Sequence, residues 1–226
     1  MTKPAAVEIL VAPDPAAAAA EAAAWLARRI RSAVRARGLA HVAFSGGTTP
    51  ALMLADLAPM TLPWAAVHAY QVDERVAPDD DPDRNAGLLA VLPVPRRQVH
   101  LMGVTSADLR AAARRYAAAL PEVLDVVHLG VGDDGHTASW PPGDSVVDDP
   151  RRVALSGPYR GRLRMTLTPA AVNDARARLV LATGAAKADP VQRWLLDDPD
   201  VPVHHVRRVG TTVVLDAAAA GRLSAS

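Results

Sequence analysis

Short apolar runs alternate along this chain with longer segments whose apolar residues recur at helical spacing. The apolar runs predict strands at residues 7–11, 40–44, 67–72, 99–102, 126–131, 163–167, 178–183, 203–206 and 212–215. Between them, we expect helices from Pro15, with Asp14 as N-cap, to Gly38, at 51–58, at 107–119, from Pro169 onward and at 185–196. This alternation is typical of a mostly parallel sheet with helices on both faces. No repeat or linker interrupts it, so we expect one α/β domain over residues 1–226.

The composition argues against several classes of protein. Half of the 226 residues are apolar, which is enough for a sizeable core. Lys and Arg number 25 against 24 Asp and Glu, so the chain carries no electrostatic footprint for nucleic acid or a membrane surface. The absence of cysteine excludes disulfides, thiol catalysis and cysteine-based zinc sites. The first residues lack the long apolar stretch of a signal peptide, and we therefore expect a cytoplasmic protein.

Four of the predicted strands end in unusual polar or glycine-rich segments. These segments are Ser45 to Thr48, Asp73 to Arg75, Gly130 to His136, and Gly184 to Lys187. In open parallel sheets, ligands bind outside the carboxyl ends of the strands. We therefore expect the four segments to meet and form one binding site.

The first of these segments, SGGTTP at residues 45–50, joins a strand to a helix. Its two glycines let backbone N–H groups approach an anion, and the N-terminus of the following helix adds a favourable dipole. The alternative is a tight turn without a ligand. The segment is neither a Walker A loop nor a GxSxG elbow, so Ser45 is not expected to be a nucleophile.

Two further groups of charged residues follow or occupy strands. VDERVAP is either a solvated loop with an internal Glu–Arg pair or, given its place at the binding edge, a source of functional Asp73 and Arg75. RLRMTLT and GAAK supply Arg162, Arg164 and Lys187. These cations form either an exposed face or a pocket for a phosphate group.

The segment GVGDDGHTAS at residues 130–139 carries the most specific chemistry. Histidine titrates near neutrality, so His136 can act as a general base without heavy tuning. Gly135 allows the chain to fold back, so the carboxylate of Asp134 can orient the imidazole. A metal site at Asp133, Asp134 and His136 is an alternative, although no second histidine lies at ligand spacing. Six other histidines fall in or beside predicted strands, which favours structural roles: His41, His68, His100, His128, His204 and His205.

In this order, SGGTTP, VDERVAP with Asn85, LGVGDDGHTAS, RMTLT and the Gly–Lys pair resemble the glucosamine-6-phosphate isomerase/6-phosphogluconolactonase family, in its lactone-hydrolysing branch. The resemblance implies a Rossmann-like, NagB/RpiA/CoA-transferase-like α/β fold without metal or organic cofactor. It implies hydrolysis of 6-phospho-D-glucono-1,5-lactone to 6-phosphogluconate, the second step of the oxidative pentose phosphate pathway. His136 is then the base and Asp134 its partner. The substrate site is lined by Ser45, Gly46, Gly47, Thr48, Asp73, Arg75, Asn85, Arg164 and Lys187.

The chemistry of the residues agrees with this resemblance. With no cysteine and no elbow serine, attack by a water molecule that His136 activates is simpler than an acyl-enzyme route. Backbone N–H groups at Gly46 and Gly47 can meet the developing oxyanion. The expected partner is therefore a small sugar phosphate, and we expect a monomer or a homodimer.

The chain departs from the family pattern at two places, and two rival functions stay open. Ser139-Trp140-Pro141-Pro142 stands where Ser-Leu-Phe-Pro is usual, and Arg84 stands where a serine commonly precedes the asparagine. The sister isomerases carry a glutamate five residues after the histidine, at the position of Pro141. One rival is therefore this activity, the isomerisation and deamination of glucosamine 6-phosphate. The other is a catalytically silent module that only binds a sugar phosphate, although such a module has no evident use for an intact Asp134–His136 pair.

Overall fold

The computed structural model describes residues 7–223. Its main sheet is built from β1 (Glu8–Ala12), β2 (Ala40–Phe44), β3 (Val67–Gln71), β5 (Val99–His100), β6 (Val126–Gly130), β9 (Ala177–Ala182) and β10 (Thr211–Asp216). All neighbouring strands in it run parallel, in the order β1-β10-β9-β6-β2-β3-β5. The expected parallel α/β architecture is confirmed.

A second, smaller sheet stands beside the first. It contains β4 (Asp73–Arg75), β8 (Arg162–Leu167) and β7 (Val153–Tyr159), paired antiparallel in that order. The strand predicted at residues 163–167 is confirmed as β8, the loop expected at Asp73 is a short strand, and no sequence pattern had indicated β7. β4 continues almost directly from β3, which carries the chain from the main sheet into the small one.

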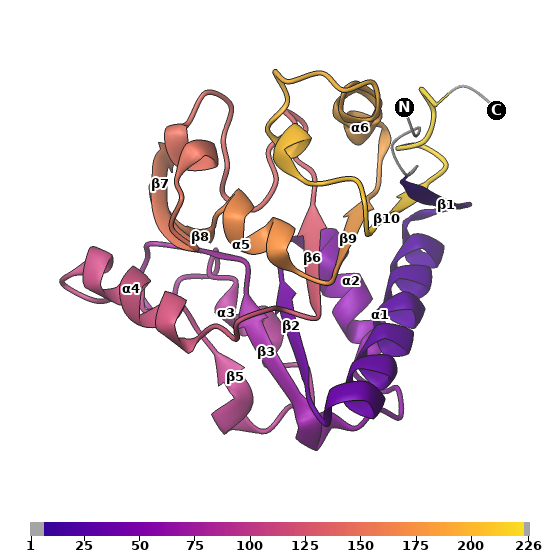
Figure 1. Ribbon diagram of the computed structural model, residues 1–226. Helices are drawn as coiled ribbons and strands as arrows, with labels where there is room; N and C mark the ends of the chain where they lie inside the picture. The colour runs from indigo at the N-terminus through magenta and orange to yellow at the C-terminus, as the bar shows by residue number, and fades with distance from the viewer. Residues whose placement is uncertain (1–6, 224–226) are drawn as a thin grey trace, which may run out of the picture.

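Helices cover both faces of the main sheet (Figure 1). α1 (Pro15–Arg37), α2 (Thr48–Leu57) and the short α3 (Ala86–Leu89) pack in one apolar core. α4 (Leu109–Ala119), α5 (Pro169–Asp174) and α6 (Ala188–Leu195) share the opposite core with the small sheet. No helix in residues 7–223 is both long enough and apolar enough to cross a membrane.

The ends of α1 follow the sequence signals. The Asp14 carboxylate accepts a hydrogen bond from the N–H of Ala17 at 2.8 Å, and Pro15 occupies the first turn. Gly38 adopts a φ of 80°, and its N–H donates to the carbonyl of Val34. Because alanines fill its buried face, α1 lies close against the sheet, and it ends where β2 must begin.

One predicted strand is a different element. Residues Pro202–His205 form a 3₁₀ helix, not a strand. Pro202 has no N–H that could donate to a neighbouring strand, and the N–H of Val203 donates to the carbonyl of Gly135 at 3.0 Å. The N–H of Val206 donates back to the carbonyl of Val203, which closes the turn. This element therefore supports the segment that carries His136 instead of extending the sheet.

Candidate active site

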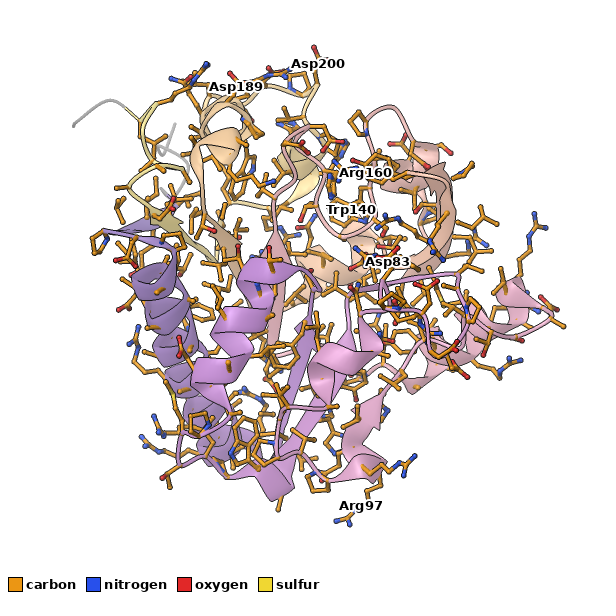
Figure 2. The ribbon with its side chains drawn as sticks, turned by 180° about the vertical axis from the view of Figure 1, so that it is seen from behind. Asp83, Arg97, Trp140, Arg160, Asp189 and Asp200 are labelled. Atoms are coloured by element: carbon orange, nitrogen blue, oxygen red, sulfur yellow. The ribbon has the colours of Figure 1, made fainter. Side chains whose placement is uncertain are left out.

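The carboxyl ends of β2, β6 and β9 open into one cavity, together with the start of β4. Its volume is about 290 Å³, a size suited to one small metabolite. Ten residues expected at the site line it: Ser45, Gly46, Gly47, Thr48, Asp73, Arg75, Asn85, His136, Arg164 and Lys187. Arg160, which also lines it, lies in the upper half of the view in Figure 2, far from Arg97 at the opposite end of the molecule.

The His136–Asp134 pair that the sequence predicted is formed. His136 Nδ1 lies 2.5 Å from Asp134 Oδ1, which also accepts the backbone N–H of His136 at 3.1 Å. Gly135, with φ of 80°, makes the turn between them. A Cβ on Gly132 would lie 1.9 Å from His136 Nδ1, so only glycine fits beside the pair. The segment therefore folds back as its glycines indicated.

The environment of Asp134 keeps this carboxylate ionised. Burial raises the pKa of Asp134, but hydrogen bonds from Tyr159 and His136 outweigh burial and lower the pKa to about 2. The carboxylate therefore accepts the Nδ1 proton of His136 and leaves Nε2 as the basic nitrogen.

The glycine-rich segment 45–47 and α2 form a second wall of the cavity. A Cβ on Gly46 would lie 1.8 Å from Asn85 Oδ1, so the backbone approaches this side chain too closely for any other residue. Gly47, with φ of 120°, is the N-cap of α2 and provides no side-chain cap, which leaves the first N–H groups of the helix available. Ser45 Oγ is buried and has no hydrogen-bond partner within residues 7–223, in keeping with its not being a nucleophile.

In the DER segment, the three charges have different roles. Glu74 is fully buried, accepts the N–H groups of Asn85 and Ala86, and pairs with Arg84 Nε at 3.0 Å. The interpretation of this segment as a solvated loop was wrong, because Glu74 is buried and its carboxylate fixes the loop that follows. Arg84, a departure from the family pattern, holds the carboxylate that positions Asn85.

Asp73 is the buried carboxyl group of the cavity wall. Its Oδ2 accepts from Ser139 Oγ at 2.6 Å and lies 4.0 Å from Arg164 Nη1, while Asn85 Nδ2 donates to its backbone carbonyl. Burial raises the pKa of Asp73, although Ser139, Arg75 and Arg164 oppose the increase. The loop after Ser139 is anchored by the buried Trp140, whose Nε1 donates to the carbonyl of Leu167 at 2.7 Å.

Four cations line the cavity: Arg75, Arg160, Arg164 and Lys187. Burial lowers the pKa of Arg164, and Arg75 lowers it further by repulsion; Arg164 Nε has no partner within the described part of the chain. Such a buried, incompletely paired guanidinium fits an anionic ligand. Arg162 does not take part, because it turns outward to Asp81 and Asp83.

Sequence reasoning missed Tyr159 and Arg160. Tyr159 Oη donates to Asp134 Oδ2 at 2.5 Å, and Arg160 pairs with Asp133 at 2.9 Å. Both sit where β7 turns into β8 through Arg160-Gly161, whose φ angles of 49° and 78° make a two-residue hairpin. The glycine before an alternating strand was the available signal for this turn.

Asp133, Asp134 and His136 place one potential ligand atom each within 4.8 Å of one another. Asp133 pairs with Arg160, and the two oxygens of Asp134 accept hydrogen bonds from His136 and Tyr159. For all three residues to bind one ion, Asp134 would have to give up at least one of these hydrogen bonds. The donor set therefore fits an acid–base pair better than a metal site.

Known proteins resemble this chain over nearly its whole length. Residues 13–215 match the family model for glucosamine-6-phosphate isomerases/6-phosphogluconolactonase. A 6-phosphogluconolactonase of Streptomyces coelicolor is 33% identical, over 97% of this chain and 95% of its own. The 6-phosphogluconolactonase structure from Trypanosoma brucei is 28% identical, covers 98% of this chain and 99% of its own, and has a TM-score of 0.83. A monomeric glucosamine-6-phosphate deaminase, 19% identical with a TM-score of 0.80 over 95% of this chain and 99% of its own, shares the fold.

Proposed function

Because the chain belongs to the glucosamine-6-phosphate isomerase/6-phosphogluconolactonase family, we propose that it is an enzyme that hydrolyses 6-phospho-D-glucono-1,5-lactone to 6-phosphogluconate. The observation that carries the proposal is the Asp134–His136 pair, held at 2.5 Å beside a cavity that four cations line. A base that faces a cationic pocket suits a neutral reacting group on a phosphorylated substrate. The proposed reaction needs no cofactor and is the second step of a cytoplasmic oxidative pentose phosphate pathway.

His136 is the general base of the proposed reaction. Its Nε2 takes a proton from a water molecule while the water oxygen attacks the lactone carbonyl carbon, and the carbonyl oxygen becomes an oxyanion. When the carbonyl re-forms, the bond from this carbon to the ring oxygen breaks. The imidazolium returns its proton to the departing ring oxygen, so water has been added across the ester bond and the base is regenerated. Asp134 stabilises the imidazolium that exists between the two transfers.

The other walls of the cavity supply the charges that the substrate and the oxyanion need. The free N–H groups at the start of α2, next to Gly46 and Gly47, suit the oxyanion, and one such contact is typically worth ~3 kcal/mol. Arg75, Arg164 and Lys187 suit the phosphate. Asp73 and Asn85, which hold each other, suit sugar hydroxyl groups.

A lactone-hydrolysis assay tests this proposal. The lactone is generated enzymatically, and the spontaneous rate is subtracted. We expect His136→Ala to lose about 10²–10⁴ of the rate, and Asp134→Asn to be impaired because its amide favours the wrong imidazole tautomer. His204→Ala is a matched control: this histidine also faces a carboxylate, Asp197 at 3.4 Å, but does not line the cavity. Near-full activity of folded His136→Ala would refute the mechanism, and an inactive parent protein would favour the silent binding module.

A further inference from the structure

We propose that Tyr159 is a positioning residue for the Asp134–His136 pair, and that its aromatic ring couples this pair to the cations that bind the phosphate. The inference rests on the proposed function and deepens it. Tyr159 is the last residue of β7, at the hairpin that reaches over the cavity, and it is partly buried.

The hydroxyl of Tyr159 completes the hydrogen bonding of the Asp134 carboxylate. It donates to Oδ2 at 2.5 Å, while Oδ1 accepts from His136 Nδ1 and from the backbone N–H of His136. Because Tyr159 donates to one oxygen and His136 to the other, the charged carboxylate cannot rotate without breaking one of these hydrogen bonds. The imidazole that depends on this carboxylate is thereby held in one orientation.

Tyr159 is suited to remain a hydrogen-bond donor. Burial, the hydrogen bond to Asp134 and the charge of Asp134 all raise the pKa of Tyr159. At neutral pH, the phenol is therefore protonated while Asp134 is ionised. Its Oη also lies 3.3 Å from His136 Nδ1, but that nitrogen makes its shorter contact, of 2.5 Å, with Asp134.

The ring of Tyr159 has a second contact surface. The guanidinium carbons of Arg160 and Arg164 lie 5.3 Å and 5.2 Å from the ring centroid, within the range of a cation–π interaction. Arg160 follows Tyr159 directly and Arg164 lies on the next strand, so one hairpin delivers both cations and the tyrosine. A phosphate that orders Arg164 therefore also orders the ring whose hydroxyl donates to Asp134.

Removing the hydroxyl has a predictable direction. In Tyr159→Phe, the Asp134 carboxylate loses a donor, so its charge and its remaining hydrogen bonds act more strongly on the imidazole that it holds. The other charged groups around the pair keep their places: Asp133 beside it, Arg160 and Arg164 from the hairpin, and Lys187 across the cavity.

The experiment separates the hydroxyl from the ring. For Tyr159→Phe we expect kcat about three- to tenfold lower, KM nearly unchanged, and the acid limb of kcat/KM moved to higher pH. For Tyr159→Leu we expect the same changes and, in addition, a higher KM, because the arginines lose their aromatic support. Tyr70→Phe is the control: it removes the other tyrosine–histidine contact, to His41 at 3.1 Å, and should leave the profile unchanged.

A readout that needs no substrate keeps this inference separate from the proposed function. In the free protein, the NMR signal of the His136 Nδ1 proton, which donates to Asp134, is assigned with His136→Gln and should move in Tyr159→Phe but not in Tyr70→Phe. If the parent lacks lactonase activity but this movement is found, the proposed function fails and the positioning role stands. An unmoved Nδ1 proton signal, or a Tyr159→Phe effect confined to KM, overturns the inference and leaves Tyr159 as a support for the arginines alone.

Discussion

The strand that leads to the catalytic segment carries a buried histidine that lowers the free energy of unfolding as the pH falls. His128, in β6, is fully buried, and neither ring nitrogen has a hydrogen-bond partner among residues 7–223. Its register partner Leu179 belongs to the apolar core under α1 and α2. Burial lowers the pKa of His128 from 6.5 to about 3 in the folded protein. The unfolded chain therefore takes up the proton first as the pH falls, and the folded protein loses stability below about pH 6.5.

The magnitude follows from this difference. One pH unit between the two pKa values corresponds to about 1.4 kcal/mol, and the linkage relation then gives a loss of about 2.3 kcal/mol in the free energy of unfolding from His128 alone between pH 6.5 and roughly pH 4.5. His128→Leu removes this proton linkage together with two unsatisfied nitrogens, each of which costs about 1–3 kcal/mol in a neutral core. We expect the variant to be more stable than the parent at neutral pH, and the difference to grow by about 2.5 kcal/mol on acidification from pH 7 to about pH 4.5.

Urea unfolding of both proteins at the two pH values measures the difference. Any misfit of the leucine side chain is the same at both values, so it cancels when the differences are compared. The variant should keep its lactonase activity at neutral pH, because His128 does not line the cavity. A gap between the two proteins that stays constant with pH would mean that the folded protein accommodates the charged imidazole, and the reasoning from burial would be wrong.

Four further outcomes test the site. Prolonged EDTA treatment should leave the activity unchanged; a loss that added zinc or manganese restores would revive the metal interpretation of Asp133 and His136. Unphosphorylated gluconolactone should be a poor substrate, with kcat/KM lower by about 10²–10⁴, and equal turnover of both lactones would mean that the cations do not bind the phosphate. Arg164→Gln should reduce the difference in kcat/KM between the two lactones, chiefly by raising KM for the phosphorylated one. Arg162→Gln, which lies outside the cavity, should leave this difference unchanged. Glucosamine 6-phosphate should release no ammonia; release in proportion to enzyme, abolished in His136→Ala, would assign the sister activity.

The sequence allowed the main sheet and most of the site to be predicted, because both depend on local pattern and one general rule. Buried parallel strands read as short apolar runs, and the carboxyl ends of such strands meet at one edge. Ser45, Asp73, His136 and Lys187 lie far apart in the chain but follow strands of the same sheet, and all line the cavity. The turn at Gly135 could also be inferred, since a carboxylate two residues before a histidine can contact it only if the chain reverses between them.

The strand at residues 163–167 was expected, but its pairing in a small sheet and the role of Tyr159 could not be predicted in the same way, because they depend on tertiary contacts. The apolar start of β7 is interrupted by Gly157-Pro158, so strand periodicity is lost just before Tyr159. Its docking against Asp134 is a contact between residues 25 positions apart that no local pattern encodes. Residues 203–206 have the composition of a strand, yet the N–H of Val203 donates to the carbonyl of Gly135, and Pro202–His205 form a 3₁₀ helix instead.

The residues around the cavity support our proposal of hydrolysis over the sister isomerisation. Isomerisation moves a proton between neighbouring sugar carbons, so it requires a further acid–base group beside the histidine pair. Pro141 occupies the position at which the isomerases carry that glutamate, and it lines a separate cavity with Asp144 and Asp148. The preceding Trp140 is fixed to the carbonyl of Leu167, so this loop cannot bring a titrating side chain toward His136 without leaving its core position. Hydrolysis needs one oriented base, hydrogen-bond donors for an oxyanion and cations that bind the phosphate. Residues suited to each of these three tasks line one cavity.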